Sequence, residues 1–159
     1  MSSLTPNETY RKISDISLDY LINDIKIKGL IFDFDGTLFR KNVISDGTFK
    51  FLKEAKERGL KIAVLSNNFH VSNSLLKEMN ITTTKKFALK PLKRPFQDMA
   101  RRMKLPAERI AVIGNNRFSD IFGANRARMY SIYIQDINNY FFKKKIKNNL
   151  KDNGIKHIE

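Results

Sequence analysis

The chain has 159 residues, of which 42% are hydrophobic and 29% charged, with no cysteine and a formal net charge of +14. This length suits one domain with a substantial core, and the lack of cysteine excludes disulfides and thiolate metal sites. The excess of positive charge favours polyanionic partners such as nucleic acid, an anionic membrane surface or phosphorylated substrates. Alternatively, it reflects only the composition rich in Lys, Asn, Ile and Phe that an AT-rich genome favours.

The first 14 residues, MSSLTPNETYRKIS, are polar and lack the apolar run of a signal peptide. No later apolar run is long enough to span a bilayer. We therefore predict a flexible polar segment over residues 1–14, a single domain over residues 15–159, and a cytoplasmic protein.

Short apolar runs alternate with amphipathic stretches along the rest of the chain. The runs KGLIFDF, KIAVLS and RIAVIG are nearly continuous, as in central parallel strands covered on both faces. The predicted strands are residues 28–34, 61–66, 86–89, 109–114 and 130–135. This alternation predicts an α/β fold with a mainly parallel five-stranded sheet and helices on both faces.

The stretches between the strands carry helix signals. Ser17 can cap a short leading helix in SLDYLIND, and Asp46 can cap a helix that ends at Gly59. Further helices are predicted in VSNSLLKEM, in RPFQDMARRMK, over residues 119–128, and in the basic closing stretch NNYFFKKKIKNNLKDN.

Polar side chains follow the predicted strands, at the edge of the sheet where such folds carry their chemistry. Asp33 and Asp35 end the first strand, where residues two apart face the same side, and Gly36 and Thr37 follow. Two carboxylates this close repel each other unless a cation lies between them. Mg²⁺, which prefers oxygen ligands, is the usual solution.

The next strands also end in polar residues. Ser66 and Asn67 supply a hydroxyl and an amide after the second strand, and Lys90 supplies a cation after the third. After the fourth, the loop GNNRFSD places Asp120 six residues beyond Gly114. This set suits phosphoryl transfer, in which one aspartate attacks phosphorus and another moves protons. A lysine, a hydroxyl and a metal would neutralise the phosphoryl oxygens.

These segments resemble the four motifs of the haloacid dehalogenase (HAD) superfamily, and more narrowly the YqeG-like subgroup of the HAD IIIA phosphatases. The likeness runs from about residue 15 onward and rests on DISLDYLINDIKIKGLIFDFDGTL, VLSNN, the KP dipeptide, VIGNNRFSDIFGANRARMYSIYI and FFKKKIKNNLK. The resemblance implies a Rossmann-like sheet and Mg²⁺-dependent phosphomonoesterase activity.

The resemblance also implies roles for the motif residues. Asp33 would be the nucleophile and a metal ligand, and Asp35 the general acid and base, with its main-chain carbonyl on Mg²⁺. Asn115 and Asp120 would complete the metal site. The phosphoryl group would be bound by Thr37, Ser66, Asn67 and Lys90. Lys90 would also be a catalytic residue.

The spacing of the motifs agrees with the capless type of this superfamily. No cap domain fits between Asp35 and Ser66, or between Ser66 and Lys90. An open site favours a bulky or surface-presented substrate, such as a lipid phosphate. Relatives in mitochondria hydrolyse phosphatidylglycerophosphate, which suggests that class of substrate by analogy.

The fourth motif departs from the family pattern Gly-Asp-x-x-x-x-Asp, because Asn115 replaces the first acid. Its amide oxygen can ligate Mg²⁺ but brings no charge, so we predict weaker Mg²⁺ binding and lower activity. The departure leaves an alternative open: a catalytically weakened HAD-fold module that binds RNA or a ribosome-associated partner.

Basic residues concentrate in KKFALKPLKRPFQDMARRMK and in the closing segment 141–151. That segment could lie on an anionic membrane surface with Phe141 and Phe142 inserted, which would make the protein peripheral to a membrane. The same lysines could instead contact RNA phosphates. A third interpretation is a solvated helix with Phe141, Phe142 and Ile146 packed in the core.

Overall fold

The computed structural model describes residues 3–40, 43–69 and 71–135. In this part of the chain one sheet has the strand order β1-β6-β5-β2-β3-β4, and each neighbouring pair is parallel. The strands are β1 (Glu8–Tyr10), β2 (Gly29–Phe32), β3 (Lys61–Leu65), β4 (Thr83–Lys85), β5 (Ile110–Gly114) and β6 (Tyr130–Ile134). The chain crosses from β4 to β5 on the other side of β2, so the switch in strand order, where such sheets bind ligands, lies between β2 and β5.

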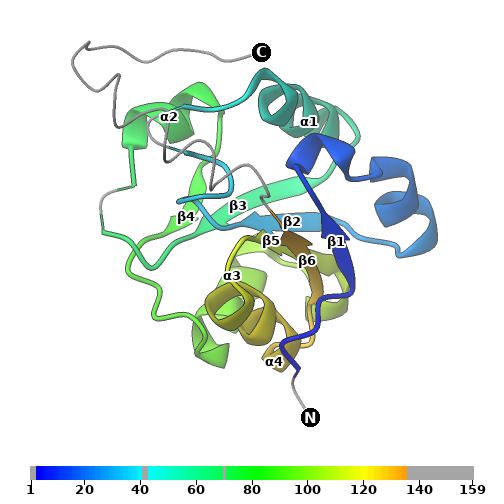
Figure 1. Cartoon of the computed structure of the whole chain (residues 1–159), viewed down its shortest axis with the longest axis vertical. Helices are drawn as coiled ribbons and strands as arrows, with labels where there is room; N and C mark the ends of the chain where they lie inside the picture. Colours follow the sequence, from blue (N-terminus) through cyan, green and yellow to red (C-terminus); the bar gives the residue numbers. More distant parts are fainter. Residues whose placement is uncertain (1–2, 41–42, 70, 136–159) are drawn as a thin grey trace.

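Helices cover both faces of the sheet (Figure 1). On one face lie α1 (Asp46–Glu57) and α2 (Asn73–Glu78), and on the other lie α3 (Lys93–Met103) and α4 (Gly123–Arg126). Each face has its own apolar cluster, one with Phe51 and Leu75 and the other with Phe96 and Met99. Shorter helical segments are η1 (Ile13–Asp15), η2 (Tyr20–Asp24), η3 (Ala107–Arg109) and η4 (Arg117–Phe122).

The predicted α/β fold is confirmed, but the structure adds a sixth strand. Residues 8–10, which the sequence assigns to a flexible segment, form β1 and pair with β6. The neighbouring Asn7 side chain accepts a hydrogen bond of 2.8 Å from the Ser131 N–H, which extends this contact. The sequence gives no signal here, because a three-residue, partly exposed edge strand needs no apolar run.

The predicted strand over residues 86–89 is wrong: β4 covers Thr83–Lys85 instead. The apolar residues 87–89 lie in a loop, in which Phe87 and Leu89 have left-handed φ angles of 48° and 60°. The threonines that form β4 are β-branched and lie at the sheet edge, where burial does not require apolar residues.

Two helix predictions also change. The N-cap of α1 is Ser45 rather than Asp46, because the Ser45 hydroxyl accepts a 3.1 Å hydrogen bond from the Thr48 N–H. The helix predicted over residues 119–128 consists of η4 followed by α4. The predicted basic closing helix and the surface over residues 141–151 lie outside the described residues. Within those that are described, no helix has the length and apolar character needed to cross a membrane.

Candidate active site

A tight loop follows β2 and positions the two aspartates of the first motif. The Asp33 N–H donates to the Ile113 carbonyl at 3.0 Å, which ties the loop to β5. Gly36 has a φ of 79°, and a Cβ atom at this position would lie 2.2 Å from Asn115 Nδ2. Glycine is therefore required here both by its conformation and by the close approach of Asn115. The loop brings the β2 and β5 motifs into contact.

Lys90 lies between two carboxylates at the centre of the site. Its Nζ atom donates to Asp33 Oδ1 at 2.7 Å and to Asp120 Oδ1 at 2.6 Å. All three residues are buried, and Asp120 is fully inaccessible to solvent. Asp33 and Asp120 are therefore held on either side of one buried cation, although they come from different strands.

The charges of this cluster shift the pKa values of its members. Burial and, next, the negative charge of Asp120 raise the pKa of Asp33 to about 6, because together they outweigh the opposing effect of Lys90. Burial alone would lower the pKa of Lys90, but Asp120 and Asp33 outweigh it and raise the pKa. Lys90 therefore stays charged near neutral pH. Two carboxylates against one ammonium leave the site with surplus negative charge, which favours a bound cation.

Of the two predicted hydroxyl ligands, Thr37 contacts this cluster directly and Ser66 lies at the end of the neighbouring strand β3. Thr37 Oγ1 donates to Asp33 Oδ2 at 3.3 Å, and both residues are buried. Ser66 is also buried, and its Oγ atom accepts from the Asn68 N–H at 3.0 Å. Because Ser66 Oγ acts as an acceptor in that bond, its own proton remains available to a ligand.

Asn67, a predicted phosphate ligand, contacts the main chain of Lys90. Its Nδ2 atom donates to the Lys90 carbonyl at 3.0 Å, and its Oδ1 atom accepts from the Lys90 N–H at 2.7 Å. Both ends of the amide are thus occupied by the main chain of Lys90. This side chain positions the lysine, and its assignment as a direct phosphate ligand rests on the sequence alone.

Asp35 is exposed, unlike Asp33. Its Oδ2 atom accepts from Asn68 Nδ2 at 2.8 Å, so Asn68 orients it. Sequence reasoning missed Asn68, although the SNN run after β3 places this amide directly behind the two predicted site residues. An exposed, oriented carboxylate can meet the leaving oxygen of a substrate that arrives from solvent.

The predicted metal ligands are three aspartates and Asn115, and the structure does not gather the three aspartate side chains into one cluster. Among the described residues, no three Asp, Glu or His side chains gather closely enough to hold a metal ion. Both Asp120 oxygens already accept hydrogen bonds, one from Lys90 and one from the Asn116 N–H at 3.0 Å. Both Asp33 oxygens also accept hydrogen bonds, from Lys90 and Thr37. The predicted donors are the Asp33 and Asp120 carboxylates, the Asp35 main-chain carbonyl and the Asn115 amide. All of them are oxygens, which fits Mg²⁺ in chemical type.

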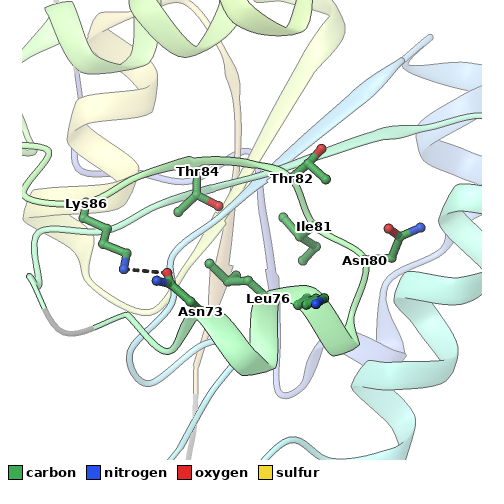
Figure 2. Close-up of a pocket in the computed structure, with 8 residues that line it drawn as sticks. Asn73, Leu76, Asn80, Ile81, Thr82, Thr84 and Lys86 are labelled. Atoms are coloured by element: carbon green, nitrogen blue, oxygen red, sulfur yellow. Dashed lines mark hydrogen bonds between the residues drawn. The ribbon is translucent and has the colours of Figure 1, made fainter.

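A hollow of about 430 Å³ lies away from these motifs, between α2 and the loop that carries β4 (Figure 2). Lys86 reaches across it and donates to Asn73 Oδ1 at 2.7 Å. The other lining residues are Leu76, Lys77, Asn80, Ile81, Thr82 and Thr84. No carboxylate lines this hollow, so the chemistry is expected at the strand ends instead.

Comparison with known proteins agrees with this arrangement. The sequence model of the haloacid dehalogenase-like hydrolases matches residues 41–128. The chain is similar to Probable phosphatase YqeG of Bacillus subtilis (strain 168), with 32% identity over 133 residues that cover 81% of this chain and 76% of that protein.

Two solved structures show the same fold. An uncharacterized protein from Listeria monocytogenes serotype 4b is 23% identical, with a TM-score of 0.59 and coverage of 69% of this chain and 79% of that one. The cobalt-bound deoxy-D-mannose-octulosonate 8-phosphate phosphatase from Haemophilus influenzae is 22% identical, with a TM-score of 0.50 and coverage of 57% of this chain and 60% of that one.

Proposed function

Because the chain belongs to the haloacid dehalogenase-like hydrolases and is a phosphatase of the HAD type, we propose that it hydrolyses phosphomonoesters through an aspartyl-phosphate on Asp33. The observation that carries this proposal is Lys90, buried between Asp33 and Asp120. An ammonium in this place holds the nucleophile and leaves a positive charge beside the oxygens of an incoming phosphoryl group.

The residues of the site divide the reaction between them. A carboxylate oxygen of Asp33 attacks phosphorus, and the bond from phosphorus to the ester oxygen breaks. Asp35 gives a proton to the leaving oxygen. It then accepts a proton from the water that attacks the aspartyl-phosphate, which releases inorganic phosphate and restores Asp33. Ser66 donates to a phosphoryl oxygen through its free O–H, and Asn67 holds Lys90 in position.

A divalent cation belongs in this proposal, and its preferred identity is Mg²⁺. The Asp33 carboxylate, the Asp35 carbonyl and the Asn115 amide would hold it, and when bound it would neutralise charge on the phosphoryl oxygens. Asp120 would complete the metal site, and it also positions Lys90, whose Nζ atom donates to it at 2.6 Å. Asn115 adds no negative charge, so this chain should bind Mg²⁺ more weakly than a relative with an acid at that position.

The substrate we favour is a phosphomonoester presented on a surface, such as a lipid phosphate like phosphatidylglycerophosphate. The described residues between Asp35 and Ser66 form α1 and β3, and those between Ser66 and Lys90 form α2 and β4. None of these described segments is a cap domain. An active site without a cap domain can reach a phosphate group on a substrate that stays in a larger assembly, such as a lipid in a bilayer.

The test is phosphate release by the purified protein, with Mg²⁺ and with EDTA. The substrates are an aryl phosphate and vesicles that contain phosphatidylglycerophosphate, and Asp33→Asn is the control. We expect release that requires metal, disappears in Asp33→Asn and is faster on vesicles. If neither substrate gives release above that variant, the enzyme proposal fails for these substrates and the RNA-binding alternative should be tested next.

A further inference from the structure

Exposed apolar side chains lie on the segments that carry residues of the candidate active site. Phe87, Leu89, Leu92 and Phe118 each expose between 51% and 63% of their surface, and Phe69 exposes 70%. They come from three loops that follow β3, β4 and β5, which also carry Ser66, Lys90 and Asp120. We call residues 66–69, 71–72, 86–94 and 115–119, which comprise these loops and the first residues of α3 and η4, the rim. An apolar concentration of this kind on a folded surface usually marks an interaction site.

The three loops of the rim are continuous with one another. The Phe87 N–H donates to the Asn68 carbonyl at 3.3 Å, which joins the first loop to the second. Arg126 joins the second to the third: it donates to the Pro91 carbonyl at 3.5 Å and lies 5.5 Å over the ring of Phe122. Phe122 in turn stacks on Phe118, with ring centres 5.7 Å apart. These contacts hold the segments that bear the exposed side chains next to one another.

The charge of the rim has a single sign. Its residues, which end at residue 119, include no aspartate and no glutamate. The cations of the rim are Lys86, Lys90, Lys93, Arg94 and Arg117, and the last three of these are exposed. The Arg117 guanidinium lies 4.3 Å over the ring of Tyr133, which leaves Lys93 and Arg94 as the cations that can meet a partner. A surface that is apolar at its tips and basic between them is complementary to a partner that is anionic at its surface and apolar beneath it.

Two leucines of the rim occupy positions where folding favours a polar residue. Leu89 has a left-handed φ of 60°, a conformation that Asn and Gly adopt more readily than an aliphatic residue. Leu92 is the N-cap of α3, where Ser or Asn would satisfy a free N–H group of the helix. Because both leucines expose about half of their surface, each gains little stability from burial. Their apolar character therefore points to contact with a partner.

We propose that the rim docks on the surface of an anionic lipid bilayer, with Leu89 and Leu92 inserted and Lys93 and Arg94 against the headgroups. This inference rests on the proposed function, since a lipid phosphate in that bilayer would lie level with Lys90, which stands between the two leucines. RNA fits the rim less well, because bases stack on aromatic rings and leucines offer none.

Co-sedimentation of the full chain with vesicles tests the proposal, using phosphatidylcholine alone and an equimolar mixture with phosphatidylglycerol. We expect binding to the anionic vesicles that weakens at high salt. The double variant Leu89→Asn, Leu92→Ser should bind about tenfold more weakly, because it removes two inserted side chains. Its melting temperature should stay the same or rise, since both substitutions suit the local backbone. Phe49→Gln on α1, outside the rim, should bind like the wild type.

A second pair of variants tests the charges. Lys93→Gln with Arg94→Gln should weaken binding about fivefold for each cation removed, whereas Lys50→Gln with Lys53→Gln on α1 should not. The proposal is overturned if the wild type does not bind anionic vesicles, or if both rim variants bind them as tightly as the wild type does. The proposal is also overturned if the wild type binds a single-stranded RNA oligonucleotide instead of vesicles and the rim variants lose that RNA binding.

Aryl phosphate hydrolysis, measured in parallel, separates this inference from the proposed function. The leucine variant should keep the wild-type rate, because neither side chain belongs to the catalytic set. Hydrolysis without vesicle binding would refute the docking surface alone. Vesicle binding without hydrolysis would refute the proposed reaction alone.

Discussion

Asp33→Asn should stabilise the metal-free protein at neutral pH, although it removes the proposed nucleophile. Burial and the charge of Asp120 raise the pKa of Asp33 from 3.8 to about 6. The folded state therefore holds this proton more tightly than the unfolded state does. The resulting stability is complete below pH 3.8 and is lost as the pH rises through about 6. At pH 7 the ionised carboxylate costs the fold about 3 kcal/mol.

Urea unfolding in EDTA measures this effect. The Asp33→Asn variant keeps the volume of the side chain and an oxygen that can accept from Lys90. We expect its free energy of unfolding to exceed that of the wild type by about 2–3 kcal/mol near pH 7, and the difference to shrink toward zero near pH 4. Asp35→Asn is the matched control, because it removes an exposed carboxylate, and it should change the free energy by less than about 0.5 kcal/mol.

The opposite result would refute the reasoning. If Asp33→Asn is less stable than the wild type at neutral pH, attraction to Lys90 outweighs burial and repulsion by Asp120. A gain that does not depend on pH would also contradict the argument, because titration of Asp33 would then not be its source.

Three further predictions concern the same site. Asn115→Asp should tighten Mg²⁺ binding about tenfold by adding a charge beside the metal and should raise activity; an unchanged Mg²⁺ dependence of phosphate release would contradict this. Lys90→Gln should lower kcat/KM at least about a thousandfold and cost about 3 kcal/mol in urea unfolding, because it leaves buried carboxylates without their cation. Gly114→Ala should cost about 2 kcal/mol, since its Cβ would lie 2.3 Å from Asp120 Oδ2. Gly29→Ala, which meets only the flexible ends of two side chains at 2.6 Å, should lower the melting temperature less.

The central strands could be predicted because their sequence signal is local. Segments such as residues 61–66 are apolar at nearly every position, as burial on both faces requires. At the sheet edges this requirement is absent, so β1 gave no signal and the prediction for β4 fell on the loop that follows it. The apolar residues Phe87 and Leu89 suggested a buried strand, but their side chains are exposed.

The sequence by itself determined which kinds of residue follow each strand, because a motif and its strand are neighbours along the chain. It therefore placed Asp33, Ser66, Lys90 and Asp120 at one edge of a parallel sheet. Only the tertiary structure decided their contacts. Lys90 lies between carboxylates that are 57 and 30 residues away in the chain. Burial and pKa depend on such distant neighbours, and so does the exposure of the rim leucines, because these properties arise only when the loops pack together.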